Sequence, residues 1–114
     1  YYIVVKHRNT LETWSATSVL FSAPSISYDF TNLASKSFGN NEVSLGDGNF
    51  AIWSGDVNQD GFINMTDLTS LESSLLSYLL GYYSQDLNGD NLVESADMSL
   101  LENNLPFSLI LMKP

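Results

Sequence analysis

The pattern of apolar and polar residues changes near Ser54 and Gly55. Before this point, short apolar segments rich in β-branched and aromatic residues, which favour strands, are separated by Gly, Pro, Asn and Asp. The predicted strands are Tyr1–Val5, Glu12–Ser15, Ser18–Phe21, Ile26–Phe30 and Phe50–Trp53, and Arg8-Asn9 is among the turns. The sequence therefore predicts an N-terminal antiparallel, β-sandwich-like half over residues 1–54.

A strand count raises the question of whether this half is complete. Immunoglobulin-type sandwiches use about 100 residues and seven strands, more than residues 1–54 provide. One hypothesis is that a strand from upstream sequence or from a neighbouring copy completes the sheet, which could build a filament. The other is a smaller sheet whose edge is covered by a closing strand at Phe107–Met112.

After Gly55 the apolar residues recur at steps of three and four, as on one face of a helix. The first such series should end at Gly81 and the second before Pro106; their members are Leu68, Leu71, Leu75, Leu76 and Leu79, then Met98, Leu101 and Leu105. The predicted fold class is α+β. The expected divisions are residues 1–54, a loop-helix pair at 55–105, and a tail or closing strand at 106–114.

An acidic loop precedes each predicted helix, and its residues return 30 positions later, from Asp56–Asp67 to Asp86–Asp97. Calcium takes six to eight oxygen ligands, and a 12-residue loop supplies them from positions 1, 3, 5, 7, 9 and 12. The first loop offers Asp56, Asn58, Asp60, the Phe62 carbonyl, Asn64 through water, and Asp67. The second offers Asp86, Asn88, Asp90, the Leu92 carbonyl, Glu94 and Asp97. The sequence predicts two calcium ions.

Three further features of the loops carry structural expectations. The sharp turn at position 6 suits Gly61, and in the second loop Asn91 should tolerate the left-handed conformation. At position 8, Ile63 and Val93 are expected to pair the two loops back to back. Asp67 and Asp97 should also accept hydrogen bonds from backbone N–H groups at the helix starts.

The alternatives to calcium are weaker. A single loop of this kind could be an Asx-rich turn that caps a helix, but the second copy with the same oxygen positions disfavours this. Magnesium requires a tighter octahedron, and zinc prefers nitrogen or sulfur ligands, for which only His7 is available. A glycosylation signal at Asn64 lies inside the loop, where modification would compete with the ion.

Charge supports a bound cation and excludes some partners. The formal net charge is −9, and residues 37–112 contain 11 carboxylates and no Lys or Arg. Such a surface repels nucleic acid and anionic membranes. The absence of cysteine removes disulfides and thiolate metal sites, and no apolar segment approaches the length of a membrane span. Because Tyr1 is not a methionine, we expect a piece of a longer precursor.

Residues 55–105 resemble the paired calcium-binding repeats of dockerin domains, which are EF-hand-like loop-helix units that anchor secreted bacterial proteins to cohesins. The resemblance implies calcium at the residues named above, with Asp at position 12. It also implies that a partner contacts loop positions 10 and 11, here Met65, Thr66, Ser95 and Ala96, and the following helices, which carry Glu72 and Glu102. The N-terminal Tyr1–Asn9 and the Gly55–Gly61 junction are similar to C-terminal regions of large bacterial surface proteins.

The sequence therefore indicates a calcium-binding module for protein–protein anchoring or assembly, secreted or at the cell surface, and not an enzyme. Its partner would be cohesin-like or another copy of itself. A purely structural, calcium-stabilised domain is the alternative function. No residue set suggests catalysis: His7 is expected at a solvent-facing strand end, and Trp14 and Trp53 are expected in the core instead of a carbohydrate platform.

Overall fold

The computed structural model describes all residues from Tyr1 to Pro114 and divides into two compact units. Unit 1 contains Tyr1–Lys6, Glu12–Trp53 and Leu111–Pro114. Unit 2 contains Ser54–Ile110 together with the short segment His7–Leu11. None of the helices is both long and apolar enough to cross a membrane.

Unit 1 has two separate antiparallel sheets of two strands each. In the first, β1 (Val4–Val5) pairs with β2 (Thr13–Trp14), with Val4 opposite Trp14. In the second, β3 (Glu42–Ser44) pairs with β4 (Phe50–Ile52), with Val43 opposite Ala51. Two 3-10 helices, η1 (Ala34–Lys36) and η2 (Phe38–Asn40), precede β3.

The strands of unit 1 fit the sequence prediction only in part. The α+β class is confirmed, but two isolated hairpins do not show a sandwich. Predicted strands Ser18–Phe21 and Ile26–Phe30 form no strand, and β3 was not expected. Leu20 and Phe21 are exposed, so these β-favouring residues lack the packing partners that would stabilise a pleated sheet.

Unit 1 has no fully buried apolar side chain. All seven buried hydrophobic residues of the chain belong to unit 2, whereas the buried residues of unit 1 are Thr13, Ser15, Ser37, Asn41 and Glu42. Trp14 and Trp53, expected in the core, are half-buried. The fully buried positions of unit 1 are thus polar. Two-stranded hairpins without a hydrophobic face are only marginally stable in water.

Glu42 is an unfavourably buried acid in unit 1. Neither of its carboxylate oxygens has a hydrogen-bond partner, and the Ser37 hydroxyl donates to the Ala34 carbonyl at 2.9 Å. Burial raises the pKa of Glu42, the neighbouring Ser37 hydroxyl partly opposes this effect, and the negative charge of Asp29 adds to it. The charged form is therefore disfavoured in the folded state.

We expect Glu42→Gln to stabilise unit 1 at pH 7 by roughly 1 kcal/mol, because it removes an unpaired buried charge. A raised folded pKa costs stability above the unfolded value of about 4.5, and the cost disappears as Glu42 becomes protonated in acid. The variant should therefore lose its advantage near pH 4. Denaturant titrations followed by tryptophan fluorescence measure this, since both tryptophans lie in unit 1; an equal advantage at both pH values would contradict it.

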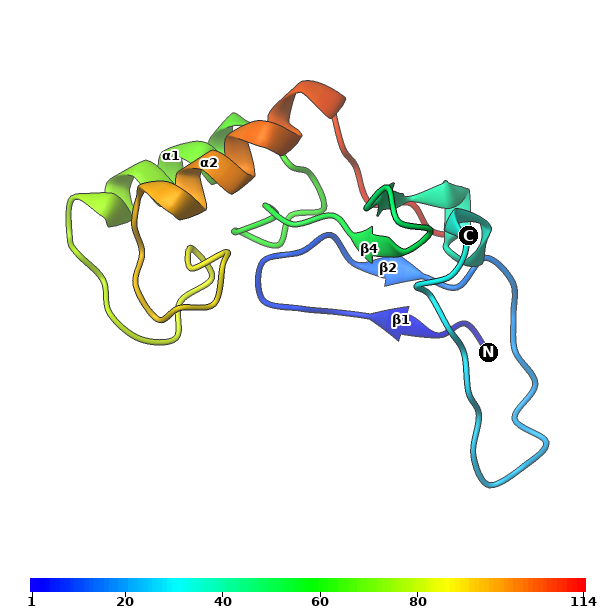
Figure 1. Ribbon diagram of the computed structural model, residues 1–114. Helices are drawn as coiled ribbons and strands as arrows, with labels where there is room; N and C mark the ends of the chain where they lie inside the picture. Colours follow the sequence, from blue (N-terminus) through cyan, green and yellow to red (C-terminus); the bar gives the residue numbers. More distant parts are fainter. The chain divides into compact units, whose positions relative to one another are not determined.

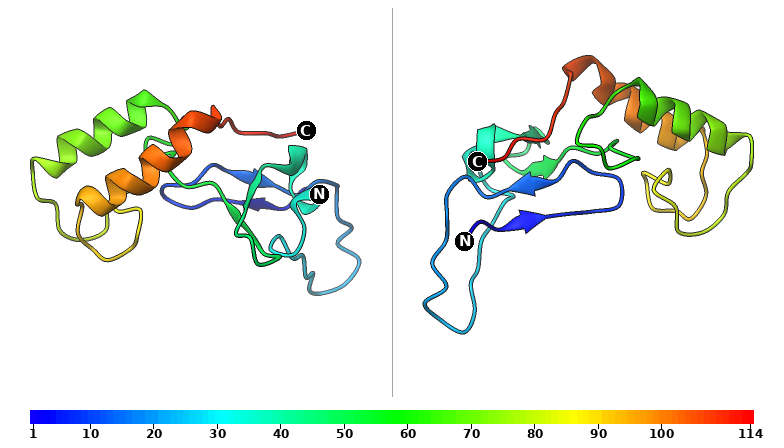
Figure 2. Two further views of the ribbon diagram at one scale, coloured as in Figure 1. Left: turned by 45° about the horizontal axis from the view of Figure 1, so that its top comes forward. Right: turned by 180° about the vertical axis from the view of Figure 1, so that it is seen from behind.

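Unit 2 is built on two helices, α1 (Met65–Leu75) and α2 (Ser95–Asn104), which lie side by side (Figure 1, Figure 2). They bury Leu68 and Leu71 from α1 and Leu101 from α2. Val57, Ile63 and Val93 from the preceding loops complete this core together with Leu11. The apolar periodicity thus predicted both helices and the burial of Leu68, Leu71 and Leu101, but Leu76, expected on the same face, lies beyond α1 and is 85% exposed.

The helix ends follow the sequence less closely. The α2 helix ends at Asn104, before Pro106, as predicted, and a short 3-10 helix, η3 (Leu105–Phe107), follows. The prediction that the first helix continues to Gly81 is wrong, because α1 ends at Leu75 and Tyr78 adopts a left-handed φ of 47°. The segment between Leu75 and Gly81 is not helical and instead pairs with the second loop through a bridge between Leu80 and Leu92.

Each acidic loop pairs with the segment that follows the other repeat's helix. The Ile63 N–H donates to the Leu109 carbonyl at 3.0 Å, and the Val93 N–H donates to the Leu79 carbonyl at 3.0 Å. The expected back-to-back pairing of Ile63 with Val93 is therefore wrong. The closing strand at Phe107–Met112 is reduced to a single bridge between Phe62 and Ile110. The first loop therefore pairs with the segment after α2, and the second loop pairs with the segment after α1, instead of the two loops pairing with each other.

Candidate metal centre

The position-12 aspartates organise both loops in the same way. One Asp67 oxygen accepts from the N–H groups of Val57 and Asn58 at 2.8 and 3.2 Å, and the other accepts from Asn64 at 3.0 Å. Asp97 repeats this pattern with Leu87, Asn88 and Glu94, at 2.7, 3.0 and 2.9 Å. Each aspartate is the third residue of its helix and completes a capping box, which confirms the expected bonds at the helix starts.

The position-1 aspartates bind the middle of each loop. Asp56 accepts from the N–H groups of Asp60 and Gly61, both at 3.1 Å. In the second loop Asp86 accepts from Gly89, Asp90 and Asn91 at 2.8, 3.2 and 3.0 Å. The left-handed conformation at position 6 is confirmed, with φ of 86° at Gly61 and 68° at Asn91.

The remaining side chains form short-range turns on the loop surface. Asn58 and Asp60 accept from backbone N–H groups two residues later, and Asn88 and Asp90 do the same, all at 3.0 Å. The Asn58 amide also donates to Asp60 at 3.0 Å. Phe62 and Leu92, whose carbonyls are the expected ligands at loop position 7, come two residues after Asp60 and Asp90 in the sequence. No three acidic or imidazole side chains converge closely enough to hold a metal by themselves.

The electrostatics of the first loop suit a bound cation. Asp56 and Asp67 are at most 2% exposed. Burial raises the pKa of Asp56 to about 6, and the charges of Asp67 and Asp60 add to this effect, although backbone hydrogen bonds from Gly61 and Asp60 oppose it. Buried carboxylates with uncompensated charge fit a divalent cation that takes oxygen ligands.

Asn64 has a structural role besides its predicted contact through water. Its side-chain oxygen caps α1 by accepting from the Thr66 N–H at 2.7 Å. We therefore expect Asn64→Ala to cost about 1 kcal/mol of stability with little change in calcium affinity. Asp60→Ala should instead abolish one of the two predicted calcium-binding events, because it removes a predicted direct, charged ligand. Calorimetric titration of both variants tests this difference, and equal losses would show that the ligand positions are misassigned.

Sequence reasoning missed a contact with the second loop. Arg8, expected in a turn of the N-terminal half, places its Nη2 3.5 Å from the Asp86 carboxylate. Asn9 beside it donates to the Asp86 carbonyl at 2.9 Å. The only signal in the sequence was charge, since Arg8 is one of four basic residues in a chain with 13 acidic ones. His7 is exposed, as expected.

Comparison with known proteins identifies the loop-helix pair. The family model of the dockerin type I domain matches residues 54–106, slightly less than half of the chain. No characterised protein and no solved structure matches the sequence. Residues 54–106 are therefore a dockerin-like segment, which confirms the resemblance found in the sequence. Dockerin domains are non-catalytic modules that bind calcium and attach to cohesins.

Proposed function

We propose that this chain, whose residues 54–106 form a dockerin domain, anchors a secreted or cell-surface protein to a cohesin-like partner when calcium is bound. The observation that carries the proposal is the repeated hydrogen-bond pattern of Asp67 and Asp97. Two loops held in one conformation would each present oxygen ligands from the same six loop positions. Two calcium ions follow, one in each loop.

The proposed ligands are those that the calcium-loop spacing selects. They are Asp56, Asn58, Asp60, Phe62, Asn64 and Asp67 in the first loop, and Asp86, Asn88, Asp90, Leu92, Glu94 and Asp97 in the second. When bound, calcium supplies positive charge that compensates the buried carboxylates. We propose no enzymatic activity, because the site consists of loop ligands that hold an ion and includes no partnered nucleophile.

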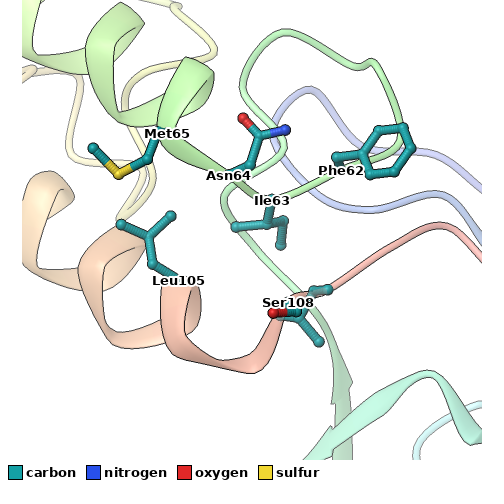
Figure 3. Close-up of a pocket in the computed structure, with 7 residues that line it drawn as sticks. Phe62, Ile63, Asn64, Met65, Leu105 and Ser108 are labelled. Atoms are coloured by element: carbon teal, nitrogen blue, oxygen red, sulfur yellow. The ribbon is translucent and has the colours of Figure 1, made fainter.

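An apolar hollow beside the first loop offers a contact surface for the partner. It has a volume of about 320 Å³, and its lining includes Ile63, Met65 and Leu105. Met65, at loop position 10, and Leu105, after the end of α2, point toward one another across it (Figure 3). Met65 is 63% exposed. We propose that this hollow receives an apolar side chain of the cohesin-like protein, whose surroundings should be basic because residues 37–112 contain no Lys or Arg.

Binding of the purified chain to a panel of immobilised type I cohesins tests the proposal. We expect binding in millimolar calcium, loss of binding in EGTA, and a reduction of at least about ten-fold for Met65→Asp. The matched control is Leu76→Asp, another highly exposed apolar position of unit 2, which should bind normally. If no cohesin binds although calcium does, the purely structural function replaces the anchoring function.

A second function, self-assembly, is favoured by the lack of a fully buried apolar side chain in unit 1. The strand β1 pairs with β2 in a sheet of only two strands, so its other edge can accept a further strand. In this alternative, a strand from another copy completes a β-sandwich and a filament results. Light scattering and electron microscopy in calcium should then show assemblies, whereas a monodisperse monomer would refute it.

A further inference from the structure

The segment His7–Leu11 lies outside the dockerin match but belongs to the same compact unit as the calcium loops. Its side chains contact the start of the second loop. The Asn9 amide donates to the Asp86 carbonyl at 2.9 Å, and Arg8 donates to the carbonyls of Tyr83 and Asp86 at 3.1 and 3.2 Å. Asp86 is the first proposed ligand of that loop.

The main chain of the same segment contacts the first loop. The Asn9 carbonyl accepts from the Gly55 N–H at 2.7 Å. The Thr10 carbonyl accepts from the Gln59 side chain at 3.1 Å, and the same Gln59 nitrogen donates to the Asp56 carbonyl at 2.7 Å. The first loop is thus held by carbonyl groups of the segment, and the second loop by its side chains.

Burial makes the Asn9 contact specific. Asn9 is 2% exposed and Asp86 is 1% exposed. The polar groups of a buried amide need hydrogen-bond partners. The side-chain oxygen of Asn9 has one in His7 Nδ1, at 3.1 Å. The amide nitrogen is therefore directed at Asp86. Groups that orient a ligand from outside the coordination shell commonly change metal affinity by 10- to 100-fold when they are removed.

Arg8 adds a fixed positive charge to the second loop. This loop has four proposed carboxylate ligands, Asp86, Asp90, Glu94 and Asp97, whereas the first has three. The Arg8 guanidinium lies 3.5 Å from the Asp86 carboxylate and 4.4 Å from the centre of the Tyr82 ring. It thereby offsets the additional negative charge and holds Asp86 from a second direction.

We propose that Asn9, supported by Arg8, is a positioning residue for the second calcium loop, acting by fixing Asp86. The functional calcium module therefore extends beyond residues 54–106 to include the turn at His7–Leu11. This inference rests on the proposed calcium binding. It predicts that a change in the Asn9 side chain weakens one loop selectively, because the segment's hydrogen bonds with the first loop use only its main-chain carbonyls.

The test measures each loop separately in the full chain by calorimetric titration with CaCl₂. Asp60→Ala leaves the second loop intact, and Asp90→Ala leaves the first loop intact. Asn9→Asp keeps the side-chain size but removes the amide that donates to the Asp86 carbonyl. In the Asp60→Ala background it should weaken calcium binding by the second loop about ten-fold or more. In the Asp90→Ala background the change should stay below about two-fold, because the Asn9 carbonyl remains in place.

Asn104→Asp is the matched control, since the Asn104 amide also donates to a backbone carbonyl of unit 2, that of Ser54, at 2.7 Å. It should leave the calcium affinity of the second loop unchanged. If Asn9→Asp loses its helical circular dichroism, Asn9→Ser, which adds no charge, replaces it. Equal effects on both loops, or none, would overturn the inference. Failure of the wild-type chain to bind calcium would instead overturn the proposed function.

Discussion

Removal of calcium should unfold the helices of unit 2 at a much lower temperature. Ligand binding stabilises the folded state by about 2.7 kcal/mol per site at a hundred-fold excess over Kd, hence roughly 5 kcal/mol for the two proposed sites. Only seven buried apolar side chains form the core of this unit, and domains of about 60 residues are marginally stable. The buried carboxylates of Asp56 and Asp67 would also remain uncompensated.

Melting curves followed by circular dichroism at the helix band, in calcium and in excess EGTA, measure this effect. Both α-helices lie in unit 2 and both tryptophans in unit 1, so helix signal and tryptophan fluorescence report on different units. We expect a decrease of more than about 10 °C in the helix transition and a smaller change in fluorescence. Magnesium at the same concentration is the control for ionic strength. Superimposable helix transitions in calcium and EGTA would show that calcium is not part of the fold.

Substitution of Gly55 by alanine should strongly destabilise unit 2. Gly55 has a φ of 123°, and a Cβ atom there would lie 2.7 Å from Leu101 Cδ1 and 3.1 Å from Ile63 Cγ2. Both neighbours are fully or almost fully buried. Backbone strain and overpacking together should cost roughly 3 kcal/mol. The Gly55 N–H bond to Asn9 would also be disturbed.

Gly81→Ala separates the effect of backbone strain from that of overpacking. Gly81 has a similar φ of 118°, but its nearest contact for a Cβ is Tyr83 Cε2 at an ordinary 3.9 Å. Strain alone should cost about 1 kcal/mol there. Denaturant unfolding of both variants in calcium, followed by circular dichroism, provides the comparison. Equal destabilisation would mean that the core at Leu101 and Ile63 relaxes around the added methyl group.

The local chemistry of the loops was predictable because its signals are local. The spacing of Asp56 and Asp67, and its return 30 positions later, identified the dockerin-like segment. The left-handed conformation of Asn91 and the capping bonds of Asp67 and Asp97 depend on neighbouring residues along the chain. The helical faces of Leu68, Leu71 and Leu101 follow from apolar spacing.

The strands were less predictable. Segments such as Ser18–Phe21 have β-favouring composition but form no strand, whereas Glu42–Ser44 forms one despite a buried charge. Strand formation depends on cross-strand partners and on burial, which a single sequence does not specify. The sandwich inferred from such composition is accordingly not shown.

The sequence by itself determined the two acidic loops, the helices that follow them and the excess of negative charge. Tertiary structure alone decided that the loops pair with Leu79 and Leu109 instead of with each other, because that choice depends on how the two repeats pack. It also brought Arg8 and Asn9 to Asp86, across more than 70 positions of the chain. Contacts between residues so far apart in the chain produce no repeating pattern in a single sequence, because only folding brings these residues together.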